Sequence, residues 1–430
     1  MQLEPTEQTE PRESAEPASS SSALRERLSA AALALLLAPA AAMADSAATT
    51  QIDYTTLFYG EQGRTQVFEP IVRATRLFGD GQSISAQLGI DVITGSSPSG
   101  ALPSGSVQTV TSPSGRDITV PAGQIPLTKF EDHRFGLDGE WQKPWGSFFT
   151  STVGAHVSRE KDYQSLGLNA KVSADLMQRM VTVTVGGGYN DDSVFPVGGT
   201  PIGLSDGSEV SKGANSKRVK SVLFGVSRVL TRRWILSVDG TRTFERGYLT
   251  EPYKVISLVS PFNGLPVGQL TDNRPSSRTR SSALLSSVYH LRNDIIYTSY
   301  RYYWDTWSVR SNTIDLKYRH DLREGWYFEP HVRYYRQGAA SFYTIGLSTQ
   351  LAPPEYATAD YRLGRLTTLT IGADFGFRVG DNPSQWTLRA EYIRQKGDGL
   401  DPNADGVQSS FDPSPAINTV TAVIGYSFNF

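Results

Sequence analysis

The chain of 430 residues contains no cysteine. This absence excludes a disulfide framework, thiolate zinc sites, iron-sulfur clusters and covalently attached haem. Long apolar runs are nearly absent too, because the one continuous stretch, residues 28–38, has about half of the ~20 residues that a spanning helix needs. A helical membrane protein is therefore excluded, and the fold must be held by burial and backbone pairing.

An excess of charge of one sign is also missing, since 41 basic residues stand against 43 acidic ones. This balance gives no electrostatic basis for binding nucleic acid. The sequence has no G-x-S-x-G, Walker or HExxH motif. Its five histidines are scattered over separate segments: His133, His156, His290, His320 and His331. We therefore expect a protein without enzymatic activity or catalytic residues, and without a nucleic-acid partner.

The short apolar run has the features of an export signal. It follows Arg25 and Arg27 and ends in Ala42-Met43-Ala44, the small-x-small pattern that a signal peptidase cuts. The preceding residues 1–22 are rich in Glu, Ser and Pro and lack an apolar face, which is typical of disorder. The sequence thus predicts a disordered leader at 1–22, a signal peptide at 23–44 and an exported remainder.

From residue 51 onward, apolar and polar residues alternate with a period of two. In 82–94 the apolar series Ile84, Ala86, Leu88, Ile90 and Val92 alternates with Ser83, Ser85, Gln87, Gly89 and Asp91. The same alternation recurs at 164–175 and at 366–378. A period of two indicates β-strands with one apolar and one polar face.

The alternation predicts sixteen strands, each long enough to cross a bilayer at a tilt, with short and long connections in turn. They span 51–60, 68–78, 82–94, 132–141, 147–158, 164–175, 180–190, 217–229, 234–244, 278–290, 295–306, 310–319, 326–336, 366–378, 384–394 and 418–430. This is the pattern of an all-β, transmembrane, antiparallel up-and-down barrel over 51–430. Fourteen or eighteen strands stay open, because 95–131, 245–277 and 337–365 have room for extra hairpins.

A soluble sandwich or lipocalin-like barrel would also alternate, but its core could not hold the polar and charged residues found at the inward positions. The last strand points the same way. It ends with an aromatic residue at every second position, Tyr426, Phe428 and Phe430, which is typical of the signal read by the barrel-assembly machinery. We therefore expect an outer-membrane location, with that machinery and outer-membrane lipid as partners.

Three segments carry a resemblance to a known bacterial family. They are Ile90-Asp91-Val92-Ile93-Thr94-Gly95-Ser96-Ser97-Pro98, Ser158-Arg159-Glu160-Lys161-Asp162-Tyr163 and Gly187-Gly188-Tyr189-Asn190-Asp191-Asp192. Through these segments the chain resembles the domain of unknown function 3570 family. The resemblance extends over nearly the whole exported part. The resemblance implies an outer-membrane barrel and no assigned activity.

The predicted inward face carries charges of both signs: Arg134, Asp138, Glu140, Lys171, Asp175, Arg301, Asp305, Asp315, Lys317, Arg319, Glu329, His331, Arg333, Arg389 and Glu391. Such charges line an aqueous path or pair across strands and fill the lumen. The first reading predicts a passive, porin-like channel for small hydrophilic or charged solutes. The second predicts a non-conducting scaffold for a periplasmic or surface partner. A homo-oligomer is compatible with both.

One loop carries a calcium-like pattern. Asp401, Asn403 and Asp405 are followed by Gly406, and Asp412 occupies the twelfth position, where the usual residue is a longer Glu. Hard cations prefer several oxygen ligands on a tight turn, so the spacing predicts a calcium site. The alternative is an ordinary solvated Asp/Gly loop, and no other cofactor is expected.

Overall fold

The computed structural model describes residues 49–111, 117–378, 384–397, 406–410, 412 and 416–430. Residues 44–430 form one compact unit. The predicted leader and signal peptide lie outside the described residues and remain predictions. Among the described residues, no helix is long and apolar enough to cross a membrane.

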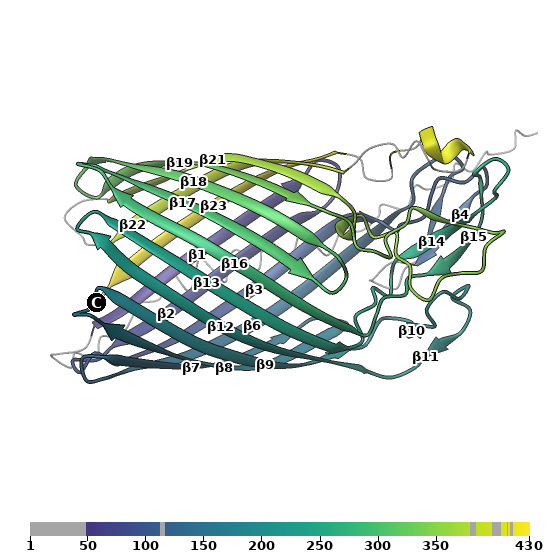
Figure 1. The fold of residues 1–430 in the computed structure, drawn as a ribbon. Coiled ribbons are helices and arrows are strands. Elements are labelled where there is room, and N and C mark those ends of the chain that lie inside the picture. Colours follow the sequence, from purple (N-terminus) through teal and green to yellow (C-terminus); the bar gives the residue numbers. More distant parts are fainter. Residues whose placement is uncertain (1–48, 112–116, 379–383, 398–405, 411, 413–415) are drawn as a thin grey trace, which may run out of the picture. The chain divides into compact units, whose positions relative to one another are not determined.

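Sixteen antiparallel strands form a closed barrel, seen from the side in Figure 1. The ring closes where β1 pairs with β23, and the amide of Thr50 donates to the carbonyl of Phe430 (2.9 Å). Closure leaves no free strand edge, which a sheet in hydrocarbon requires. In ring order the strands are β1 Thr49–Glu61, β2 Gln66–Leu77, β3 Ser83–Pro98, β6 Leu127–Trp145, β7 Phe149–Arg159, β8 Tyr163–Leu176, β9 Val181–Val194, β12 Asn215–Thr231, β13 Trp234–Gly247, β16 Ser277–His290, β17 Asp294–Asp305, β18 Arg310–Arg323, β19 Trp326–Gln337, β21 Leu366–Arg378, β22 Gln385–Lys396 and β23 Ile417–Asn429.

The prediction of sixteen strands is confirmed, and each predicted range overlaps one strand of the ring. The long connections do contain further strands, but these pair with one another outside the barrel. They are β4 Gln108–Thr111 with β5 Asp117–Val120, β10 Thr200–Pro201 with β11 Val210–Ser211, and β14 Val255–Val259 between β15 Pro266–Thr271 and β20 Gly346–Ser348.

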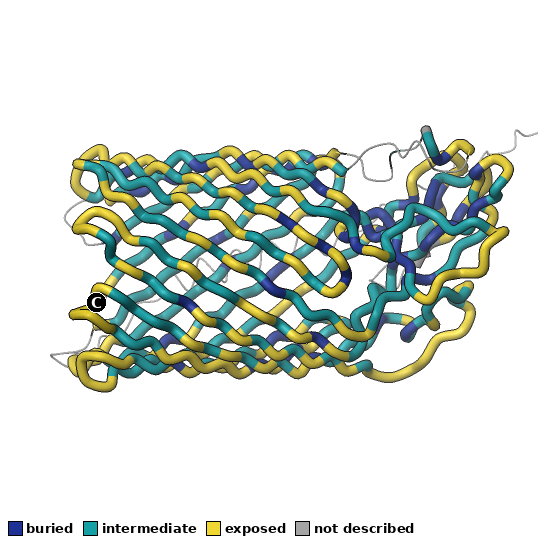
Figure 2. Tube along the Cα trace, in the orientation of Figure 1, coloured by how far each residue is buried: buried dark blue, intermediate teal, exposed yellow. Residues whose placement is uncertain are grey.

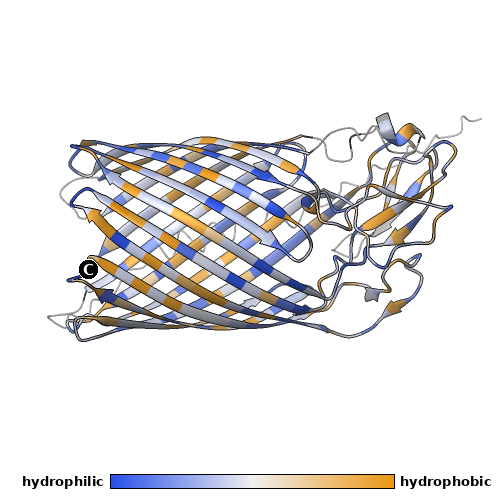
Figure 3. Cartoon of the chain, viewed as in Figure 1, coloured by the Kyte–Doolittle hydropathy of each residue, from blue (hydrophilic) through white to orange (hydrophobic). Residues whose placement is uncertain are grey.

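The two faces of the wall differ in polarity, as the alternating colours along each strand in Figure 3 show. On one face, large apolar side chains stay exposed, among them Leu168 (62%), Val222 (53%) and Ile371 (52%). Solvent-exposed apolar rows of this kind are costly in water but match the hydrocarbon of a bilayer. The polar face therefore lines the barrel interior.

The two ends of the barrel also differ. The connections at the end where the chain terminates are short, whereas the other end has five long connections and three short turns, 62–65, 160–162 and 306–309 (Figure 1). We call the latter end the mouth, and its five long connections, 99–126, 195–214, 248–276, 338–365 and 397–416, the mouth loops. The two short 3-10 helices, η1 Tyr361–Leu363 and η2 Gly406–Ser410, both belong to the mouth loops.

The deeply buried residues gather at the mouth, where Figure 2 shows most of the dark blue segments. Trp307, Val309, Ala340 and Leu363 form a small apolar core there, and Trp307 is only 4% exposed. The ring of Phe342 packs edge-on against Trp307 at 5.2 Å. The mouth thus has a small core of its own, formed where the 338–365 loop packs against the β17–β18 turn.

Candidate functional site: the capped mouth

One mouth loop, Tyr248–Ser276, hydrogen-bonds to the other four, and we call it the hub loop. Its backbone contacts are Val255 to Ser99 (2.9 Å), Thr271 to Leu204 (3.2 Å), Asn273 to Ala357 (3.1 Å) and Asn263 to Val407 (2.9 Å). The hub loop follows β13, whereas Ser99 follows β3, six positions away around the ring. Segments anchored so far apart can bond directly only by crossing the opening, so the mouth loops bridge it.

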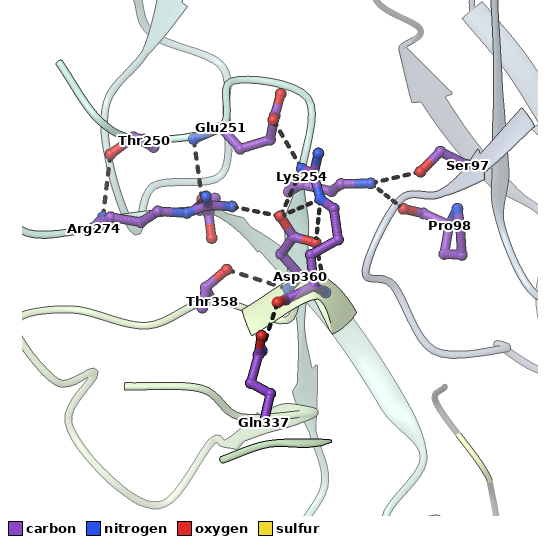
Figure 4. Close-up of polar contacts among 11 residues, drawn as sticks. Ser97, Pro98, Thr250, Glu251, Lys254, Arg274, Gln337, Thr358 and Asp360 are labelled. Carbon is purple, nitrogen blue, oxygen red and sulfur yellow. Dashed lines mark hydrogen bonds and ion pairs between the residues drawn. The ribbon is translucent and has the colours of Figure 1, made fainter. Parts of the chain in front are cut away.

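A cluster of opposite charges connects the loops that cross the opening (Figure 4). Asp360 accepts from Arg274 (3.0 Å) and from Arg362 (2.7 Å), and its side chain is 1% exposed. Lys254 donates from Nζ to Ser97 Oγ (3.0 Å) and to the carbonyl of Pro98 at the end of β3. The cluster joins the hub loop, the 338–365 loop and the barrel wall through hydrogen bonds between charged groups, which are stronger than neutral ones.

Burial and ion pairing shift the pKa of Asp360 in opposite directions. Burial by itself would raise the pKa of Asp360, but the guanidinium groups of Arg362 and Arg274 outweigh it and hold that pKa below its ordinary value. Burial lowers the pKa of Lys254. A buried carboxylate held ionised by two guanidinium groups is strongly destabilised when either partner is lost, because a buried charge remains unpaired.

Beneath the hub loop lies a cavity of about 500 Å³, which we call the mouth cavity. Its walls come from the ends of β8, β9, β12, β13 and β16, from the β7–β8 and β17–β18 turns, and from both ends of the hub loop. Its lining includes four acidic residues, Glu160, Asp162, Glu245 and Glu251, and four basic residues, Lys217, Arg274, Arg278 and Arg280. A volume of this size, with several converging polar groups, is typical of a small-molecule site.

The basic residues of the cavity are already paired. Lys217 lies 3.4 Å from Asp192, Arg278 lies 2.5 Å from Asp305, Arg280 pairs with Glu245, and Arg274 pairs with Asp272 (2.6 Å) and Asp360. By contrast, Glu160 and Asp162 form no ion pair with a basic residue within the described part of the chain. The uncompensated charge of the mouth cavity is therefore negative.

Asp132 of β6 lies close to Glu160 and Asp162. One carboxylate oxygen from each of the three residues lies within 4.8 Å of the others. Burial, followed by the negative charge of Asp132, raises the pKa of Glu160 to about 7. Burial also raises the pKa of Asp162, against the opposing hydrogen bond from Tyr253. Like charges brought together away from water share protons rather than ionise fully.

Tyrosines complete the cavity. The hydroxyl of Tyr253 donates to Asp162 Oδ2 (2.6 Å) and accepts from the amide of Val197 (2.9 Å), so it ties the hub loop to the wall. The hydroxyl of Tyr163 donates to Asp192 (2.5 Å). The hydroxyl oxygen of Tyr248 is buried and has no hydrogen-bond partner within the described residues. A buried polar atom without a partner is costly and is typical of a place where a further group belongs.

The fifteen charged residues predicted from the sequence all occupy the polar face of the wall. Register links them around the ring, because directly opposed residues of neighbouring strands share a face. Several also meet as ion pairs, but others have no ionic partner in the described structure. Apart from the contacts of His331, the closest pairs are Arg134–Asp91 (2.5 Å), Asp138–His156 (2.7 Å), Asp305–Arg278 (2.5 Å), Lys317–Glu329 (3.7 Å), Arg319–Asp321 (3.0 Å), Arg333–Asp315 (2.6 Å) and Arg389–Asp374 (3.0 Å).

Histidines of the wall bind carboxylates. His331 is buried between Asp315 (3.0 Å) and Glu391 (2.8 Å), and His156 contacts Asp138. Each of these imidazoles is oriented by an acidic neighbour. The contacts are hydrogen bonds between side chains on the inner face of the barrel.

The calcium-like loop is only partly described. Asp401, Asn403 and Asp405 lie outside the described residues, so the calcium site remains a prediction. Gly406 is described and has a φ of +52°. A Cβ atom there would lie 2.3 Å from the carbonyl of Asn263 in the hub loop. The glycine is therefore required by the close approach of the hub loop, whatever the loop binds.

Sequence reasoning missed both the charged cluster and the acidic wall of the mouth cavity. Their residues come from connections without a two-residue period, and their partners are distant in sequence. One signal was available. The segments that carry the family resemblance contain Ser97, Glu160, Asp162, Tyr163 and Asp192, and all five residues lie at the mouth.

A closed barrel with an apolar outer face, a polar inner face, short turns at one end and long loops at the other is the architecture of an outer-membrane β-barrel. Within this class, the family model for "Protein of unknown function (DUF3570)" matches residues 25–428, and the chain belongs to that family. No curated protein matches the chain significantly.

Solved structures similar to the chain are barrels at low sequence identity. A mutant of the ferric enterobactin receptor PfeA from Pseudomonas aeruginosa is 10% identical with a TM-score of 0.41, and the match covers 88% of this chain but 59% of the receptor. A FadL homologue from the same organism is 12% identical (TM-score 0.38, 89% of both chains). The outer membrane protein opdK from Pseudomonas aeruginosa is 8% identical with a TM-score of 0.40, and the match covers 89% of this chain and 99% of opdK.

Proposed function

We propose that this protein is a passive channel of the bacterial outer membrane that admits small hydrophilic or charged solutes through its bridged mouth. The observation that supports it best is the accessibility of the inward charges. The side chains of Arg333, Arg134 and Arg389 are 51%, 45% and 42% exposed although they lie inside a closed wall. Water can reach these side chains, as an aqueous path requires and as a packed interior would not allow.

The location of the apolar core supports the same proposal. The small core around Trp307 lies at the mouth, between the β17–β18 turn and the 338–365 loop, whereas the charged residues predicted from the sequence lie on the inner face of the wall. Sixteen strands give a barrel wide enough for water unless something fills it. The channel is therefore narrowed by its loops and stays open along the wall.

The experiment is single-channel recording of the refolded full chain in a planar bilayer. Discrete current steps are expected. The Arg301→Gln variant should shift the reversal potential in a salt gradient toward cation selectivity, because Arg301 is an exposed inward charge without an ionic partner in the described structure. Its thermal stability should match that of the unmodified chain. A folded protein without current steps would contradict the proposal.

A second candidate, a non-conducting scaffold for a periplasmic or surface partner, has one observation in its favour. His331, Asp315, Glu391 and Arg333 form a connected group of charges on neighbouring strands. If such pairs hold the interior together, Arg333→Gln should lower the stability of the barrel, by at most about 1 kcal/mol because the side chain is half exposed, and leave Asp315 with His331 alone. A channel predicts altered selectivity and little loss of stability for the same variant.

A further inference from the structure

We infer that the mouth cavity is a binding site for a small organic cation that carries an ammonium group, held by Glu160 and Asp162 and covered by the tyrosines of the hub loop. The inference rests on the proposed function, because it names the class of solute that the channel would take up at its mouth.

The charge balance of the cavity selects a cation. All four lining bases have an acidic partner within 4 Å, so their positive charge is already compensated. Glu160 and Asp162 form no ion pair within 4 Å in the described structure, and Arg134, whose charge acts on Glu160 from farther away, is already paired with Asp91. An anionic ligand would have to displace an existing ion pair, whereas an ammonium group would supply the missing partner of the carboxylates.

The other walls select an organic cation over a bare metal ion. Tyr248 and Tyr253 lie on the hub-loop side of the cavity, and tyrosine rings attract ammonium groups while their edges accommodate hydrocarbon. Tyr248 lines the cavity, and its hydroxyl is buried without a hydrogen-bond partner among the described residues. A cavity of about 500 Å³ is also far larger than the coordination sphere of one metal ion.

Proton sharing gives this site a pH dependence. Glu160 faces Asp132 and Arg134 of β6, Asp162 of its own turn and Tyr163 of β8. Because the pKa of Glu160 is about 7, a proton partly occupies the wall at neutral pH. An ammonium ligand competes with that proton, so its affinity should increase as the pH rises from 6 to 8.

Calorimetry of the refolded full chain in detergent tests the inference with putrescine and ethylammonium as probes and acetate as the anionic comparison. Both ammonium probes should bind more tightly than acetate. The double variant Glu160→Gln with Asp162→Asn should lose affinity by about tenfold or more, since it removes two charge-assisted hydrogen bonds. The matched control Glu324→Gln, which neutralises an exposed acid in the β18–β19 turn at the opposite end, should bind like the unmodified chain.

Equal affinity in the double variant, tighter binding of acetate, or heat from calcium chloride with none from the ammonium probes would overturn the inference. Binding in detergent does not require conduction. A chain that binds putrescine but gives no current steps would therefore contradict only the channel, and a chain that conducts without binding would contradict only the cation site.

Discussion

The barrel wall and the mouth loops are stabilised in different ways. In the wall, backbone pairing between neighbours closes a ring, and apolar side chains such as Leu168 face outward. At the mouth, apolar side chains such as Ala340 and Leu363 of the 338–365 loop pack inward against Trp307 of the β17–β18 turn, and a buried charge cluster joins distant segments. The wall depends on a bilayer around it, whereas the mouth has a small core that its loops share with the β17–β18 turn. The two regions should therefore respond separately to mutation.

The largest expected effect separates the loops from the wall. Asp360→Ala leaves Arg274 and Arg362 without their shared partner and should destabilise the mouth loops by about 3–5 kcal/mol, while the wall keeps its ring of backbone bonds. Hydrogen exchange should show faster exchange at the hub loop and unchanged protection in β16 and β17.

The control is Asp206→Ala, which removes an exposed carboxylate from another mouth loop. Faster exchange spread evenly over wall and loops would contradict the separation of the two regions, as would no change at the hub loop.

A smaller effect separates the two faces of the wall. Leu168→Arg places a charge on the apolar face of β8 and should lower the free energy of unfolding by about 2–4 kcal/mol near the bilayer midplane. Asn169→Arg places the same charge one residue later, on the polar face, and should change stability little. Urea unfolding in lipid vesicles measures both. Equal losses would mean that the faces are not assigned correctly.

The smallest effect is a pH dependence confined to the mouth. Asp360 has a pKa held below its ordinary 3.8, so its stabilising contribution is present above that pH and lost as the pH falls toward the lower value of the folded state. Glu160, with a pKa raised from 4.5 to about 7, acts oppositely. The folded state holds its proton more tightly, so stability falls as the pH rises through that window.

Hub-loop exchange, corrected for its intrinsic pH dependence, should therefore be slowest near pH 5 and faster at pH 3 and pH 8. In Glu160→Gln the increase between pH 5 and pH 8 should disappear and the increase at pH 3 should remain. A profile that the variant leaves unchanged would argue against Glu160 as the titrating group.

The sequence predicts the wall closely because a lipid-facing strand must alternate. The limits of that rule are visible in β6, where alternation predicts 132–141 but the strand runs over Leu127–Trp145. Toward the mouth, water reaches both faces, so apolar residues are no longer required at every second position. Pairing with β3 nevertheless continues to Leu127 opposite Pro98.

The mouth could not be predicted in the same way. The cluster of Lys254, Arg274 and Asp360 joins residues from connections with no regular period, and nothing in the local sequence marks Asp360 as buried. The inward charges were predictable as a face, but their pairing was not. Arg134 meets Asp91 because of the register between β3 and β6, which a pattern along one strand does not determine.

The hub loop has a consequence for how the mouth can open. Because all four other mouth loops bond to it, none of them can swing away as an independent flap without breaking contacts with the shared segment. Opening should then be a cooperative event, with one closed and one open state in place of a graded series. A channel built this way would switch between two current levels, and a weakened hub loop would change how often it switches more than how much it conducts.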